Sequence, residues 1–423
     1  MLKKYLSRLT SSELQRNILT LLKGSAFAQA LPILCMPLLA RLYTPEEFGL
    51  FTLYLSFVLS IVSVIGLRYD FAILLPKNNT IAWYLFTLSA KIITIFSIVS
   101  SIVLIAFNNQ ISIYLKNTQL APWLSLVGLN LFILGLTQLT TFWFNRNKQY
   151  HNMATQRVIQ STVSNGGQIA LGMGFHFGVS GLIIGNLLGQ ITALIYSLVH
   201  TKPAKHQKTN KKFDKINRKL LIHFKNFPIY NAPTALIDAL RLNGINVLLS
   251  IFFTASTLGQ FALAWRLLQS PISLINGALS QVYYQHFTQL KHLERYQFLR
   301  SCIKKSFVVG IIPFTILFVI AEPLFVIFFG KEWQQAGQIC SLLVPWLFLN
   351  FITSPISSIY MVLKQEKKLL IFSIFYMLTP LSIIFFSHDS ILETILYVSI
   401  SMSMLLCVFI GIALHLTKTH AQN

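Results

Sequence analysis

The sequence predicts an all-α integral membrane protein, with twelve transmembrane helices arranged as two six-helix lobes around a central cavity. Of its 423 residues, 54% are hydrophobic and only 11% are charged, whereas soluble domains carry about 25% charged residues. The stretches 158–201 and 333–363 contain no Asp, Glu, Lys or Arg, and a membrane span needs about 20 apolar residues. A chain of this length with so few charges lacks the polar surface that a soluble protein needs.

Twelve apolar segments are each long enough to cross a bilayer. Lipid offers no partners to backbone N–H and C=O groups, so each segment is expected to be helical. Their approximate limits are 18–41, 48–67, 81–107, 119–142, 154–175, 178–199, 230–253, 257–283, 306–329, 336–362, 369–387 and 392–416.

The Lys and Arg residues between these segments alternate between the two sides of the predicted membrane. Connections on the side of the N-terminus hold 27 of them, and the opposite connections hold only Arg41, Lys116 and Lys331. Positive charge accumulates on the cytoplasmic side of membrane proteins. Both termini are therefore predicted to be cytoplasmic. The net charge of +22 predicts contact with anionic lipids of the inner leaflet and not with nucleic acid.

A polar, Lys-rich linker at 201–229 divides the predicted spans into an N-lobe (1–200) and a C-lobe (230–423). Internal similarity crosses this linker, since 44–53 aligns with 254–263 and shares Thr, Gly, Phe and Leu with it. Pro-Trp-Leu also occurs at the entry to both the fourth and the tenth span. Each half has an even number of predicted spans, so both halves begin on the same side of the membrane. Transporters whose two lobes rock around a central cavity have this arrangement.

Five phrases carry a family resemblance. They are Arg-Leu-Tyr-Thr-Pro-Glu-Glu-Phe-Gly at 41–49, Arg-Tyr-Asp-Phe-Ala-Ile-Leu-Leu-Pro at 68–76, Phe-Pro-x-Tyr-x-x-Pro at 227–233, Gly-x-Phe-x-Leu-Ala-x-Arg at 259–266 and Gly-Lys-Glu-Trp at 330–333. Together they resemble the polysaccharide-transporter branch of the MOP superfamily. The resemblance implies a flippase in the bacterial inner membrane that moves undecaprenyl-pyrophosphate-linked repeat units outward for O-antigen or capsule synthesis. It also implies a glycan polymerase and a chain-length regulator as partners.

Six ionisable residues lie at predicted membrane depth, where an unpaired charge costs several kcal/mol of free energy. Each of them is therefore a candidate functional residue. The cations are Lys23, Lys91, Arg241 and Arg266, and the acids are Asp238 and Glu322. An excess of cations fits an anionic pyrophosphate, whose oxygens a guanidinium can hold through two parallel hydrogen bonds. We therefore expect the four cations to bind the cargo.

Structural explanations stand beside these assignments. Lys23 can reach the cytoplasmic surface through its long stem, and Glu322 near the outer interface can be hydrated. Asp238 and Arg241 are three residues apart on one helix and can neutralise each other.

The resemblance also suggests coupling to an H⁺ or Na⁺ gradient, which requires a carboxylate. Asp238 is the first candidate and Asp70 the second, although a surface hairpin with Arg68 also explains Asp70. The sequence leaves the choice between the two ions open.

Motifs for catalysis and cofactors are missing from the sequence. It holds no GxxxxGK[ST], no HExxH or other metal-ligand spacing, and no CxxC among four cysteines. A secondary transporter without cofactor or metal is predicted. Two alternatives remain, a multidrug exporter of the same superfamily and a membrane-embedded glycan polymerase. The exporter would need acids in its cavity, and such polymerases usually carry a long periplasmic loop.

Overall fold

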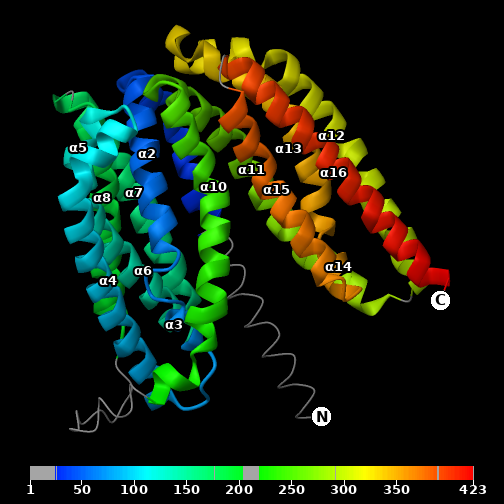
Figure 1. Ribbon diagram of the computed structural model, residues 1–423, viewed down its shortest axis with the longest axis horizontal. Coiled ribbons are helices and arrows are strands. Elements are labelled where there is room, and N and C mark those ends of the chain that lie inside the picture. The colour runs from blue at the N-terminus through cyan, green and yellow to red at the C-terminus, as the bar shows by residue number, and fades with distance from the viewer. Residues whose placement is uncertain are drawn as a thin grey trace. The chain divides into compact units, whose positions relative to one another are not determined.

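The computed structural model describes residue 24 and residues 26–175, 177–202, 219–290, 292–387 and 390–422. All regular secondary structure within these ranges is helical, as predicted. The chain forms two compact units (Figure 1). Met1–Tyr43 and Leu50–Gly244 make up unit 1, while Thr44–Gly49 and Ile245–Asn423 make up unit 2.

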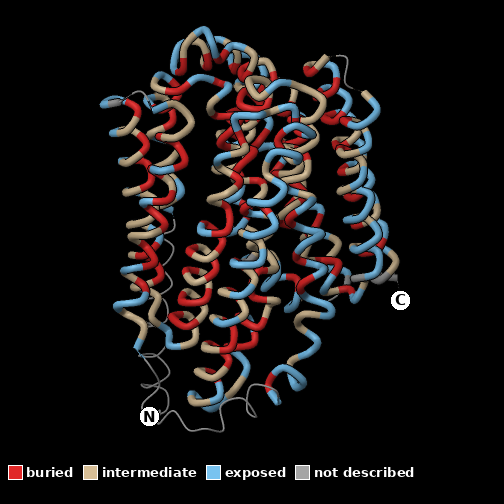
Figure 2. Tube along the Cα trace, turned by 60° about the vertical axis from the view of Figure 1, so that its left-hand side comes forward, coloured by how far each residue is buried: buried red, intermediate tan, exposed pale blue. Residues whose placement is uncertain are grey.

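Unit 1 is built from the following helices: the apolar helix Ala26–Leu42, most of α2 (Pro45–Val62), α3 (Tyr69–Ala72), α4 (Asn79–Tyr114), η1 (Thr118–Leu120), α5 (Ala121–Leu124), α6 (Val127–Arg146), α7 (Tyr150–Phe175), α8 (Val179–His200), η2 (Phe227–Asn231) and the first part of α10 (Ala232–Phe252). Helix α7 packs along α8, and α6 packs against both α4 and α8. Figure 2 shows the buried residues as stripes along the helices, which is the pattern of helices that pack on one side only.

Unit 2 is built from these helices: the rest of α10, α11 (Ala255–Gln289), α12 (His292–Phe329), η3 (Lys331–Trp333), α13 (Gln334–Ile356), α14 (Ile359–Val362), α15 (Glu366–Phe386) and α16 (Ile391–Gln422). Helix α13 lies at its centre and packs against α11, α12 and α16. Only 11% of the most apolar stretch of α12 is buried within the protein. Such an exposed apolar surface belongs in hydrocarbon, so the chain is a multi-pass membrane protein.

Nine helices of the described chain are long and apolar enough to cross a membrane. The count of twelve spans and the cytoplasmic location of both termini stay predictions. Three of the predicted spans, on Ala26–Leu42, α7 and α11, are absent from the nine. Helix α7 is less apolar than the nine, since it contains several polar residues, among them Gln156, Asn165 and Gln168, whose side chains are buried. The Nε2 of Gln168 donates to the carbonyl of Leu182 at 3.0 Å, so this polarity serves the packing of α7 against α8.

The internal repeat coincides with a close crossing of two helix N-termini within unit 2. A Cβ added to Gly49 would overlap the carbonyl oxygen of Ala255, and one added to Gly259 would overlap that of Pro45. Both helices begin with a threonine cap, because Thr44 accepts from the N–H of Glu47 and Thr254 accepts from that of Thr257. Equivalent residues of the two repeats thus meet each other, and each glycine permits the approach of the other helix.

We expect Gly259→Ala to destabilise unit 2 strongly. The added methyl group meets backbone and not a flexible side chain, so the two helix ends must separate. Overpacking of this kind costs about 1–3 kcal/mol or more. Thermal unfolding of the purified protein measures the loss. Gly277→Ala is the matched control, because a Cβ on Gly277, in the same helix, meets nothing within 4 Å; equal melting temperatures for the two variants would contradict the expectation.

Candidate functional site

Helix α10 carries a polar stripe that includes two of the predicted site residues. Thr234, Asp238 and Arg241 recur at intervals of four and three residues and so share one side of the helix. The Nη2 of Arg241 lies 3.8 Å from the Oδ1 of Asp238, and these side chains are 33% and 63% exposed. This ion pair brings a predicted cargo ligand and a predicted coupling residue together.

The exposure of this pair limits its contribution to stability. Exposed ion pairs contribute about 0–1 kcal/mol, and pairs spaced i,i+3 on one helix about 0.2–0.5 kcal/mol. We therefore expect Arg241→Gln to change the melting temperature little while reducing export of a phosphorylated cargo. A large loss of stability in this variant, measured by thermal unfolding, would assign Arg241 a structural role instead.

Arg266 lies on a second polar stripe, on α11 of unit 2. Ser270, Ser273 and Gly277 follow it at four, seven and eleven residues, so the four share one side of the helix. Arg266, Ser273 and Gly277 are exposed. No acidic side chain in the described part of unit 2 forms an ion pair with Arg266. A guanidinium on a polar, exposed helix face retains its donors for an anionic ligand.

Lys91 lies on an exposed face of α4. It is exposed and shares one side of the helix with Ile95, Ile98 and Ile102, which are 55–63% exposed. The buried residue Ile93 lies on the opposite side. The role of Lys91 in binding cargo stays a prediction.

Lys23 and Glu322 are the two remaining charged residues at predicted membrane depth. Lys23 lies outside the described residues. The Oε1 of Glu322 on α12 accepts hydrogen bonds from the Nε2 of Gln334 at 2.7 Å and of Gln338 at 3.1 Å. Glu322 therefore fastens α12 to the first turns of α13.

Asp70 lies on the four-residue helix α3, in a turn with an unusual backbone. Leu67 and Arg68, which precede α3, have φ angles of 46° and 61°. Non-glycine residues rarely adopt this left-handed conformation. The Arg68 guanidinium lies 4.6 Å from the centre of the Phe71 ring, and that ring packs against Phe142 at 4.4 Å. These contacts hold the strained turn in place.

The Asp70 carboxylate is buried, with the residue only 5% exposed. The Nε2 of Gln138 on α6 donates to its Oδ2 at 3.2 Å, while its Oδ1 is buried without a hydrogen-bond partner in the described part of the chain. Burial raises the pKa of Asp70 from 3.8 to about 6, although the nearby Arg68 and backbone N–H groups oppose this shift. A buried carboxyl that titrates near neutral pH can carry a proton.

Two contacts connect the Asp70 turn to distant parts of unit 1. The Tyr69 hydroxyl donates to the carbonyl of Leu221 at 3.1 Å, in the chain that leads to α10. Arg146 at the end of α6 donates to the carbonyl of Ile73 at 2.8 Å. A change in the charge of Asp70 therefore acts on a turn that contacts α6 and the approach to α10.

The sequence analysis missed Gln138 and Arg146. Both are far from Asp70 in the chain, and no spacing motif connects them to it. No cluster of three or more His, Cys, Asp or Glu side chains able to hold a metal ion occurs among the described residues.

The arrangement of apolar spans and polar helix faces agrees with a family match. Residues 38–338 match the model of a family described as polysaccharide biosynthesis protein. The chain belongs to this polysaccharide biosynthesis family. No curated protein matches its sequence.

Several solved structures of transporters are similar to this chain in fold. An inward-facing multidrug resistance MATE transporter is similar with a TM-score of 0.70 and 14% identity, covering 93% of this chain and 96% of the other. The lipid II flippase MurJ gives a TM-score of 0.74 and 16% identity, with 93% and 86% covered. A MOP transporter from Pyrococcus furiosus gives 0.55 and 14%, with 95% and 96% covered. The predicted all-helical membrane fold and the predicted family are confirmed, and a bacterial inner membrane fits them.

Proposed function

We propose that this protein is a flippase that moves a lipid-linked oligosaccharide with a pyrophosphate group from the inner to the outer leaflet by alternating access. Its family is involved in polysaccharide biosynthesis, and its fold is that of MOP transporters, which include the lipid II flippase MurJ. A lipid-linked glycan for O-antigen or capsule synthesis is a cargo that agrees with both the family and the fold. The protein acts as a secondary transporter and not as an enzyme.

The exposed position of Arg266 on α11 is the observation that supports the proposal most strongly. Moving a pyrophosphate through hydrocarbon without counter-charge is prohibitive, and a guanidinium on a polar helix face supplies both charge and paired hydrogen bonds. Arg241 provides a second guanidinium in unit 1, and Lys91 and Lys23 complete the proposed set of cargo ligands. A cationic drug would require the opposite excess of charge.

Asp70 replaces Asp238 as the first candidate for the coupling carboxylate. Asp238 is exposed and pairs with Arg241 on the same helix. Asp70 is buried, and one of its carboxylate oxygens has no hydrogen-bond partner among the residues that the structure describes. Its pKa of about 6 favours exchange of a proton over binding of Na⁺. Na⁺ is held by several oxygen ligands, and the turn offers only one carboxylate.

A binding experiment separates the proposed cargo from a cationic drug. Purified protein in lipid nanodiscs is titrated with a polyprenyl pyrophosphate and, separately, with ethidium, a lipophilic cation. We expect only the pyrophosphate to bind, and Arg266→Ala to weaken its binding by about 10–100-fold, since hydrogen bonds to charged groups contribute about 1.5–3 kcal/mol. Binding of ethidium alone would support a multidrug exporter.

A further inference from the structure

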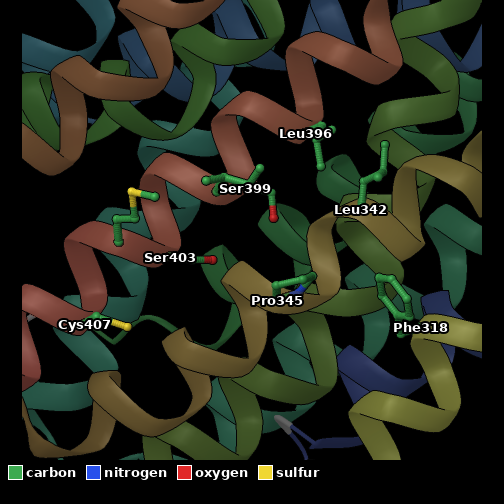
Figure 3. A pocket seen from close by; sticks show the side chains of 9 residues that line it. Phe318, Leu342, Pro345, Leu396, Ser399, Ser403 and Cys407 are labelled. Carbon is green, nitrogen blue, oxygen red and sulfur yellow. The ribbon is translucent and has the colours of Figure 1, made fainter.

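An apolar groove in unit 2 lies on the surface where α12 and α16 meet. Its volume is about 540 Å³, which is in the range of pockets that hold small molecules. Residues of α16 from Leu396 to Cys407 line one side, and Phe318 of α12 lines the other together with residues of α13 (Figure 3). The oxygens of the two serines in this lining are buried, whereas Phe318 and Met404 are 48% and 64% exposed. The accessible lining is therefore hydrocarbon.

An exposed face leads from this groove to a lysine on each of the two helices. Residues at intervals of seven share one side of a helix. Three such residues occur on each helix: Met404, Gly411 and Lys418 on α16, and Phe318, Ile311 and Lys304 on α12. All six are exposed. A Cβ added to Gly411 meets nothing within 4 Å, so the surface between the groove and the lysine of α16 is open.

The two lysines lie at the same end of unit 2. Leu299 near the start of α12 and Leu416 near the end of α16 belong to one buried core cluster. Phe318 and Met404, from the later part of α12 and the earlier part of α16, both line the groove. The two helices therefore run side by side in opposite directions (Figure 1). Each lysine is 14 residues from the groove residue on its own helix, which is about 21 Å along the helix axis.

Lys304 and Lys418 also lie at the same predicted membrane boundary. They are two residues outside the predicted spans 306–329 and 392–416, on the side that the distribution of Lys and Arg predicts to be cytoplasmic. A second cavity of about 220 Å³, lined by Ile311 among others, extends the apolar surface toward this boundary. One leaflet of hydrocarbon is about 15 Å thick. The lysines are thus at the level of the headgroups, and the apolar surface is at the depth of the inner-leaflet chains.

This combination of cations and apolar surface fits an anionic amphiphile. Residues 295–321 of α12 and 394–422 of α16 contain no Asp or Glu, so neither helix supplies an acid beside its lysine. Ammonium groups form strong hydrogen bonds with phosphate oxygens, and an exposed apolar groove favours a hydrocarbon chain. An oligosaccharide would require many polar partners, and the only polar side chains among the nine that line the groove are the two serines with buried oxygens.

We propose that the predicted cytoplasmic end of α12 and α16 binds an anionic phospholipid of the inner leaflet. Its phosphate lies between Lys304 and Lys418, and one of its acyl chains passes over Gly411 into the groove. His415, exposed on α16 one turn before Lys418, provides a further hydrogen-bond donor. The site concerns the lipid around the protein and does not rest on the proposed function.

Photo-crosslinking tests this site on the full chain in phosphatidylcholine nanodiscs. A small fraction of the lipid is a probe, either phosphatidylglycerol or phosphatidylcholine, with the same diazirine in its acyl chain, and labelled peptides are identified by mass spectrometry. We expect the phosphatidylglycerol probe to label residues 396–411 about tenfold more, equivalent to about 1.4 kcal/mol. Lys304→Glu/Lys418→Glu should abolish this preference. Lys219→Glu/Lys225→Glu is the matched control and should retain it, because it changes two exposed lysines of unit 1 on the same predicted side.

A second pair of variants and a competition test the path and the identity of the chain. Gly411→Phe should block the path and reduce labelling several-fold, whereas Gly411→Ala adds a methyl group that meets nothing within 4 Å and should not. Unlabelled phosphatidylglycerol should compete, and polyprenyl phosphate should compete no better. Equal labelling by the two probes, or a preference that survives Lys304→Glu/Lys418→Glu, would overturn the inference. Equal labelling of the two Gly411 variants would overturn the path, and stronger competition by polyprenyl phosphate would overturn the phospholipid in favour of the cargo.

Discussion

Replacing Asp70 by Asn is expected to stabilise the protein at pH 8 and at the same time to stop export. The charged carboxylate is unfavourable in its buried position, because its pKa is raised from 3.8 to about 6. Stability therefore falls as the pH rises from about 4 to about 6, and stays low above that. A neutral amide of the same shape removes a cost of up to about 3 kcal/mol. Without a titrating proton, coupling to the gradient is lost.

The pH dependence of this effect distinguishes it from general stabilisation. Thermal unfolding of Asp70→Asn and the unchanged protein should give curves that converge near pH 4 and separate above pH 6. Asp238→Asn is the matched control, since it removes a carboxylate that is 63% exposed and should alter stability little at any pH. Parallel curves for Asp70→Asn, or normal export by this variant, would remove Asp70 from the proposed mechanism.

Replacing Arg266 by Ala is expected to abolish glycan export while leaving the protein folded in the membrane. The exposed side chain has no ion-pair partner in the described part of unit 2, so its removal leaves no acid unpaired there. Loss of a bidentate phosphate contact weakens cargo binding by about 10–100-fold. Cell-surface glycan, quantified in cells that produce the variant in place of the original protein, measures the effect.

Two further variants show whether charge or geometry is responsible. Arg266→Lys keeps the charge but loses the planar pair of donors, so its export should lie between that of Arg266→Ala and the unchanged protein. Arg300→Ala removes an exposed cation from the part of α12 that precedes its predicted span and should leave export unaffected. Full export by Arg266→Ala would contradict the assignment of Arg266 to the cargo site.

The fold was predictable because membrane spans follow from local properties of the sequence. Apolar length predicted where helices occur, and the repeat at 44–53 and 254–263 marked the point where Gly49 and Gly259 meet. The two lobes predicted on either side of the polar linker at 201–229 stay a prediction. The two compact units of the structure divide after Gly244, inside α10. Composition detects solvent exposure, but the division of a helix between two packed units depends on contacts that the sequence does not display.

The candidate site was predictable only in part. The pairing of Asp238 with Arg241 followed from their spacing on one helix, which is local information. The carboxylate of Asp70 accepts a hydrogen bond from Gln138, which lies 68 residues away in the chain. No spacing in the sequence connects these two residues, so their contact becomes apparent only in the folded chain.

The location of lipid-linked oligosaccharides in cells that lack this gene tests the flippase proposal most directly. The repeat units are extracted after leaflet-selective enzymatic labelling and compared with those of the parent strain. We predict that complete repeat units accumulate in the inner leaflet only, and that production of the unchanged protein, but not of Arg266→Ala, restores them to the outer leaflet. Complete repeat units that reach the outer leaflet in the absence of the gene would contradict the proposal.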